Sequence, residues 1–475
     1  MDLTDIDAWD ADSLADLAGG LEGMLVAHRV RDLQHRLAAL RVAARDDELQ
    51  VRADGEVRAA VAVADGHPLQ RQISELSAQV SELIAEAVLV GAEFDHARAS
   101  VTAPVSADFR DNVTRVNKDW RNLCADGQAE IVKNAPELIA NLDGIPAAVR
   151  DVANRARIDT ERRRLQDDSI RIQQELQREF FGGRLSNTGA GLWYAQRKLE
   201  DLDALEELLR EDADFMLVMM DMRSGERGFA AVAVGDPGTA DHLSVTVPGL
   251  NTNVKDSMRG MALEARRLRD EAGRQLHTAG RGHEKVCTIA WIGYDAPQMT
   301  GPGKFDVGRA SLDVSRGTKA RIAADALSSF FHGLRASSVK DNPHFTALGH
   351  SYGSLATSLA LQRNGYVGVA DVVFYGSPGV RAREESQLEV AVGHVYVMKA
   401  EGDAIAGFGR FGGDPSDWSF QCLSTRSGYS PDGIYRERAF GHAEYARTGD
   451  NGELRMTGYN LAVVIAGLPE RAVLA

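Results

Sequence analysis

The spacing of apolar residues changes near residue 186 and divides the chain into two parts. Before this point the apolar positions advance in steps of three and four, most regularly through Ile73, Leu76, Val80, Leu83, Ala87, Val90 and Phe94. Such a stripe places apolar side chains along one side of a helix. A second, highly charged stretch at 158–181 ends at Gly182 and Gly183. We therefore predict an all-α domain over residues 1–185, either a helical bundle or a coiled coil.

Beyond residue 186, short apolar runs take the place of the long helical stripes. The runs occupy residues 214–222, 228–234, 243–249, 286–294, 344–351, 371–379 and 394–403. Helical periodicity separates several of them, notably at 258–273 and 318–335. This alternation indicates an α/β domain over residues 186–475, with a mostly parallel sheet flanked by helices on both faces. In such a sheet the functional residues gather where the strands end.

One of these runs leads into the pentapeptide at 349–353, in which Ser351 lies between two glycines in the pattern G-x-S-x-G. A strand, a sharp turn and a helix lift such a serine hydroxyl above the edge of the sheet. The run at 344–351 is β-compatible, and 353–364 has helical periodicity. Because both flanks fit, we predict that Ser351 is a nucleophile.

A serine hydroxyl is a weak nucleophile, so it needs a base within hydrogen-bond reach and an acid that orients the base. Two histidines follow Ser351 in the chain, His394 and His442. His394 opens a strand and therefore belongs at the far end of the sheet, whereas His442 lies in a loop-like segment. We predict that His442 is the base.

The acid is expected after the carboxyl end of a strand that lies between the nucleophile and the base. Glu401 and Asp403 both follow the strand that starts at His394. We favour Asp403, because Gly402 frees the turn and the shorter carboxylate is the commoner orienting group. Glu401 stays open as the alternative.

A developing oxyanion needs two backbone N–H groups aimed at one point. One is expected from the residue after the nucleophile, which is Tyr352, and the other from the turn after an early strand. The segment 245–253 provides such a turn at Pro248 and Gly249. We predict that Leu250 supplies the second N–H group.

Charge and cysteine content narrow the classes of partner. The formal charge of −15 argues against nucleic acid or an anionic membrane as a partner. Cys124, Cys287 and Cys422 lie far apart without C-x-x-C spacing, and H-E-x-x-H is absent, so no metal or other cofactor is expected. The acidic amino terminus lacks the pattern of a signal peptide, and no apolar run is long enough for a transmembrane segment. The expected location is the cytoplasm.

Several segments together resemble an actinobacterial α/β-hydrolase family long catalogued only as a domain of unknown function. The matching residues are VPGLNTN (247–253), AWIGYDAP (290–297), ALGHSYGS (347–354), YGSPGV (375–380), GD (402–403) and GHAEY (441–445). The resemblance spans roughly residues 213–446, and residues 141–157 look like the helical segment that precedes this core. It implies an α/β-hydrolase fold and a triad of Ser351, Asp403 and His442, but no substrate.

The expected function is a serine hydrolase that cleaves an ester or related acyl bond of a small-molecule or lipid-like substrate. Peptidases and thioesterases use the same residues and are not separated by the sequence. The alternative is a non-catalytic binding or scaffold protein, whose amino-terminal helices form a homodimer or bind a protein partner. Residues 8–23 are reminiscent of the small helical-hairpin proteins of type VII secretion, which leaves leaderless secretion open.

Overall fold

The computed structural model of the protein describes residues 108–182, 188–298, 317–363, 367–406 and 411–475. The helical stripe at 73–94, the segment 8–23 and the boundary predicted at 185 and 186 lie outside these residues and stay predictions. The chain divides into two compact units, Met1–Val105 with Lys118–Cys124 and Ser106–Asn117 with Ala125–Ala475. Every predicted site residue belongs to the second unit.

The second unit is built on an eight-stranded sheet with the order β1-β2-β4-β3-β5-β6-β7-β8. The strands are β1 (Phe215–Asp221), β2 (Phe229–Val234), β3 (His242–Val247), β4 (Val286–Ile292), β5 (His344–His350), β6 (Asp371–Tyr375), β7 (Val395–Met398) and β8 (Gln421–Cys422). β2 is antiparallel to both of its neighbours, and all other pairs are parallel. The predicted mostly parallel sheet is confirmed, and each of the seven apolar runs overlaps one strand.

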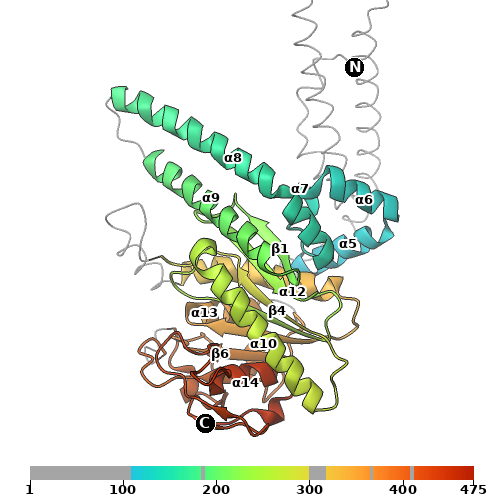
Figure 1. The fold of residues 1–475 in the computed structure, drawn as a ribbon, viewed down its shortest axis with the longest axis vertical. Coiled ribbons are helices and arrows are strands. Elements are labelled where there is room, and N and C mark those ends of the chain that lie inside the picture. The colour runs from blue at the N-terminus through green and yellow to red at the C-terminus, as the bar shows by residue number, and fades with distance from the viewer. Residues whose placement is uncertain (1–107, 183–187, 299–316, 364–366, 407–410) are drawn as a thin grey trace, which may run out of the picture. The chain divides into compact units, whose positions relative to one another are not determined.

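Helices cover both faces of the sheet (Figure 1). The helices of the described residues are α5 (Asp108–Asn122), α6 (Ala125–Asn134), α7 (Pro136–Ile139), α8 (Ala147–Gly182), α9 (Thr188–Glu211), α10 (Arg259–Thr278), α12 (Thr318–Ser337), α13 (Tyr352–Leu361) and α14 (Met456–Ile465). α9, α10 and α14 pack on one face, and α12 and α13 on the other. Among the described residues, no helix is long and apolar enough to cross a membrane.

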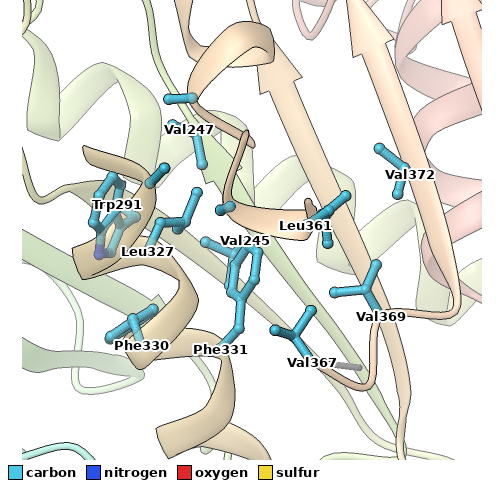
Figure 2. Packing of buried hydrophobic residues seen from close by; sticks show 14 of the residues in the cluster. Val245, Val247, Trp291, Leu327, Phe330, Phe331, Leu361, Val367, Val369 and Val372 are labelled. Carbon is cyan, nitrogen blue, oxygen red and sulfur yellow. The ribbon is translucent and has the colours of Figure 1, made fainter. Parts of the chain in front are cut away.

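Burial on both faces explains why the strands read as nearly continuous apolar runs. In β6, Val372 and Phe374 join the core under α12 and α13, whereas Val373 and Tyr375 join the core under α10 and α14. Figure 2 shows the first of these cores, where Phe331 of α12 packs beside strand residues. A strand enclosed in this way holds the loops at its carboxyl end in fixed positions.

Side chains from the segment 141–157 cap the exposed edge of the sheet at β1. The Asn141 side chain accepts a hydrogen bond from Met220 N at 3.0 Å and donates one to Met220 O at 2.8 Å. Asp151 accepts from Leu217 N at 2.5 Å, and Asn154 Nδ2 donates to Leu217 O at 3.1 Å. These bonds replace a neighbouring strand, because an open strand edge leaves backbone groups unpaired. The segment is therefore part of the structure that completes the sheet.

Candidate active site

Ser351 lies in the sharp turn between β5 and α13. Its backbone adopts φ 55° and ψ −130°, a conformation that non-glycine residues rarely adopt and that costs of the order of 1–3 kcal/mol. The turn is held by a hydrogen bond from Ser351 N to Tyr375 O at 3.0 Å. The strand, turn and helix predicted from the sequence are therefore present around Ser351.

The two glycines of the pentapeptide make room for this turn. A Cβ atom at Gly349 would lie 2.6 Å from Ser354 Cα in the first turn of α13. A Cβ atom at Gly353 would collide with the carbonyl oxygen of Val247, the last residue of β3. Only glycine lets the elbow fit between its own helix and the neighbouring strand.

His442 and Asp403, which are 39 residues apart in sequence, are joined by hydrogen bonds at the carboxyl edge of the sheet. His442 Nδ1 lies 2.9 Å from Asp403 Oδ1 and 3.0 Å from Asp403 Oδ2. Because a carboxylate only accepts, the proton of the neutral imidazole is assigned to Nδ1 and Nε2 is left as the basic nitrogen. Glu401 instead pairs with Arg438 at 2.8 Å, with both side chains exposed. Of the two predicted acids, Asp403 is the one bonded to His442.

The Asp403 carboxylate is fully enclosed and is held in its charged form by four donors. Besides His442, it accepts hydrogen bonds from Tyr445 Oη at 2.7 Å, Ile405 N at 3.0 Å and Ala406 N at 3.1 Å. Burial by itself raises the pKa of Asp403, but the hydrogen bonds from His442, Tyr445 and Ala406 outweigh burial and bring the pKa to about 2. Asp403 is therefore a carboxylate near neutral pH.

Gly376 lies between the pair of Asp403 and His442 and the turn that carries Ser351. It follows Tyr375, whose carbonyl oxygen binds Ser351 N, and it has φ 58°. A Cβ atom at Gly376 would lie 3.0 Å from Asp403 Oδ2 and 3.1 Å from His442 Cε1. The Ser351 turn and the pair of Asp403 and His442 therefore both contact the end of β6.

The turn after β3 lies directly against Ser351. A Cβ atom at Gly249 would be 2.5 Å from Ser351 Cβ, 2.8 Å from Ser351 Oγ and 3.0 Å from Tyr352 N. Tyr294 Oη anchors the turn by donating to Pro248 O at 2.7 Å. Leu250, the predicted second donor, is the next residue of this turn, and Tyr352 is the first residue of α13, where backbone N–H groups point out of the helix.

The other histidine that follows Ser351 lies at the amino-terminal ends of the strands, on the opposite side of the sheet's strand ends from Ser351. His394 precedes β7, and its Nδ1 lies 2.7 Å from Oδ1 of Asp371, the first residue of β6. This position agrees with the expectation that excluded His394 as the base.

Comparison with known proteins identifies the family. A model of the α/β-hydrolase family matches residues 224–412. An uncharacterized protein of Mycobacterium tuberculosis is 40% identical over 281 residues, which make up 56% of this chain and the whole of that relative. The chain belongs to the α/β-hydrolase family. The resemblance noted in the sequence, to an actinobacterial family of unknown function, is confirmed.

This hydrolase is also similar, at lower identity, to a second mycobacterial protein and to solved structures. A second uncharacterized protein of Mycobacterium tuberculosis is 28% identical over 304 residues, covering 62% of this chain and 44% of that relative. Among solved structures, esterase PE8 shares 14% identity with a TM-score of 0.29, covering 50% of this chain and 94% of its own. A hyperthermophilic esterase from the archaeon Pyrobaculum calidifontis shares 11% identity with a TM-score of 0.31, and the match covers 58% of this chain and 92% of that esterase.

Three residues that contact the predicted site residues of this hydrolase were not singled out from the sequence. Gly376 and Tyr445 lie within the quoted segments YGSPGV and GHAEY, and His350 lies within ALGHSYGS. Their presence in those segments was the available signal. Their roles could not be read from it, because each depends on a contact with a residue distant in the chain.

Proposed function

We propose that the protein is a serine hydrolase that cleaves an ester or related acyl bond. The observation that carries the proposal is the hydrogen-bonded pair of His442 and Asp403 at the sheet edge where Ser351 occupies a strained elbow. Family membership makes hydrolysis the expected class of reaction. The triad, the oxyanion donors and the ester substrate are the finer parts of the proposal.

In the first half of the reaction, Ser351 Oγ attacks the carbonyl carbon of the substrate while His442 Nε2 takes the hydroxyl proton. Asp403 holds the imidazole in the required tautomer and stabilises the imidazolium that forms. When the tetrahedral intermediate collapses, the bond to the leaving alcohol breaks and His442 returns its proton to the alcohol oxygen. The acyl group remains bonded to Ser351 Oγ.

In the second half, water replaces the alcohol. His442 Nε2 takes a proton from the water molecule, whose oxygen attacks the acyl carbon. Collapse of this second intermediate breaks the bond to Ser351 Oγ, which regains its proton from His442. The carboxylic acid leaves, and the residues return to their starting state.

The negative charge on each tetrahedral intermediate needs fixed donors. The backbone N–H groups of Tyr352 and Leu250 are the proposed pair, supported by the contact of the Gly249 turn with Ser351 Oγ and Tyr352 N. Preorganised donors of this kind lower the barrier because they need no reorganisation when the charge develops.

The test is hydrolysis of p-nitrophenyl esters of graded acyl length by the wild type and by Ser351→Ala. Removal of the nucleophile should lower kcat/KM by about 10⁴-fold or more, because the triad acts as a unit. Ser358→Ala is the matched control: Ser358 is a buried serine of the same helix whose Oγ donates to Val380 O at 2.6 Å, away from the candidate site. Equal activity in the wild type and in purified Ser351→Ala would overturn the nucleophile assignment.

Parallel assays with acyl thioesters and with peptides separate the related chemistries. We expect oxygen esters to be cleaved with the highest kcat/KM. A large preference for thioesters or peptides, lost in Ser351→Ala, would keep the triad but replace the ester as substrate class.

A further inference from the structure

The imidazole of His350 lies between two aromatic rings at the end of β5. Its ring centroid is 4.9 Å from that of Tyr375, with planes inclined at 26°, and 4.8 Å from that of His442, with planes inclined at 31°. The ring of Tyr445 packs on a third side, with its centroid 5.9 Å from that of His350. Although His350 precedes the proposed nucleophile in the chain, its side chain packs against the proposed base.

His350 also binds the backbone of the residue it packs against. His350 Nε2 lies 3.0 Å from His442 O. A carbonyl oxygen only accepts hydrogen bonds, so His350 Nε2 carries the proton and donates it.

Burial keeps His350 uncharged near neutral pH. Burial and, to a smaller extent, the neighbouring His442 together lower the pKa of His350 to about 4, against smaller opposing effects of the hydrogen bond to His442 O and of Asp403. The other titratable groups that pack against its ring are the Tyr375 and Tyr445 phenols. A neutral His350 adds no positive charge beside His442 when His442 takes up a proton.

A glycine in the left-handed backbone region immediately precedes His442. Gly441 has φ 73°, and a Cβ atom there would meet nothing within 4 Å. The backbone is held by Gly441 N donating to Glu401 O at 2.8 Å and by the bond from His350 to His442 O. The first of these bonds ties the segment to the loop of the acid, and the second ties it to the strand that ends at the nucleophile.

We propose that His350 is a positioning residue, which through its Nε2–H bond to His442 O fixes the His442 imidazole relative to Asp403 and Ser351. This role rests on the proposed serine-hydrolase function, because it gives His350 the task of holding the base in register with the nucleophile. Small displacements of a catalytic group have large effects on rate, so one lost backbone anchor is expected to be visible in turnover.

The test compares substitutions that keep or remove the donor. His350→Phe keeps a flat ring and removes the N–H group, and we expect kcat to fall about 10- to 100-fold with KM unchanged. His350→Gln places an amide N–H near the position of Nε2, and kcat should stay within about threefold of the wild type. His344→Phe is the matched control, because His344 begins the same strand and its Nε2 lies 3.1 Å from the carbonyl oxygen of Val464 at the opposite edge. His344→Phe should keep kcat.

A second readout does not depend on turnover. The Nδ1 proton that His442 shares with Asp403 should give a strongly deshielded proton resonance, identified by its loss in His442→Ala. We expect this resonance to broaden or shift in His350→Phe and to persist in His350→Gln and His344→Phe. A role confined to packing would change the melting temperature without moving this resonance.

The proposal is overturned if His350→Phe keeps both the wild-type kcat and the resonance. It is also overturned if kcat falls as far in folded His350→Gln as in His350→Phe. Should His350→Phe not fold, His350→Asn replaces it, because the shorter amide does not reach His442 O. If the wild type has no hydrolase activity, the proposed function fails, while the resonance still decides whether His350 positions His442.

Discussion

At the scale of single residues, the candidate site depends on positions where a side chain is missing. Gly249 lies against Ser351 Oγ, Gly353 lies against the end of β3, and Gly376 lies against the side chains of Asp403 and His442. A methyl group at any of these positions would occupy space that the site residues need. The glycines therefore set the distances between the loops that carry the site.

Gly249→Ala should lower kcat/KM by about 100-fold or more, because its Cβ would lie 2.5 Å from Ser351 Cβ and displace the turn that carries the proposed oxyanion donor. Gly249 has no positive φ, so the loss would come from the contact and not from backbone strain. The matched control is Gly260→Ala in α10, where a Cβ meets nothing within 4 Å and alanine should raise helix stability. Ester hydrolysis by both variants is the measurement. Unchanged kcat/KM in Gly249→Ala would remove this turn from the site.

Tyr445→Phe should change how stability depends on pH. The pKa of Asp403 is about 2 in the folded protein, below its ordinary value of about 4, so its interactions stabilise the fold above pH 4 and are lost as the pH falls toward 2. Without the Tyr445 hydroxyl, the folded-state pKa of Asp403 rises and this acid-dependent loss becomes smaller. The free energy of unfolding of the variant should also be about 1–3 kcal/mol lower at pH 7, because Ala400 N no longer has Tyr445 Oη as its acceptor.

Free energies of unfolding from urea titrations at pH 7, 4 and 3 provide the measurement for Tyr445→Phe. Tyr435→Phe, at an exposed tyrosine, is the control and should follow the wild type at every pH. If Tyr445→Phe loses as much stability on acidification as the wild type, the hydrogen bond from Tyr445 does not hold down the pKa of Asp403.

At the scale of elements, the sheet could be predicted because its strands are buried on both faces. Apolar runs such as 344–351 and 371–379 correspond to β5 and β6, and helical periodicity at 318–335 corresponds to α12. β8 is only two residues long, too short to produce a pattern. The capping of β1 by Asn141, Asp151 and Asn154 also escaped prediction, because polar residues in a turn or on a helix give no sign of which strand they bind.

Asn154→Ala should destabilise the edge of the sheet at β1 without changing KM. Asn154 is fully buried, and its Nδ2 donates to Ala140 O at 2.8 Å and to Leu217 O at 3.1 Å. Its loss removes a donor from Leu217 O and leaves Ala140 O with Arg150 Nε at 3.3 Å, which should lower the free energy of unfolding by about 1–3 kcal/mol. Urea unfolding is the measurement, with exposed Gln166→Ala on the same helix as control. Equal stability of the two variants would show that the cap contributes nothing, and KM should be unchanged in both.

At the scale of the whole molecule, the order of residues along the chain predicted the pairing of Asp403 with His442. Ser351, Asp403 and His442 each follow or lie beyond a parallel strand, and parallel strands end at one edge. The choice between Glu401 and Asp403 needed the structure, because two residues of a turn can face opposite ways. The contact of His350 could not be predicted either. Its neighbour in sequence is Ser351, but its hydrogen-bond partner is His442, 92 residues away.

The most direct test of the central claim is labelling of the purified protein with a fluorophosphonate probe, followed by peptide mapping. Such probes react with a serine hydroxyl that an adjacent base activates. We predict modification at Ser351 in the wild type and in Ser358→Ala, a sharp fall in the labelling rate in His442→Ala, and no label in Ser351→Ala. Folded wild-type protein that leaves Ser351 unmodified, or labels equally fast without His442, would contradict the account.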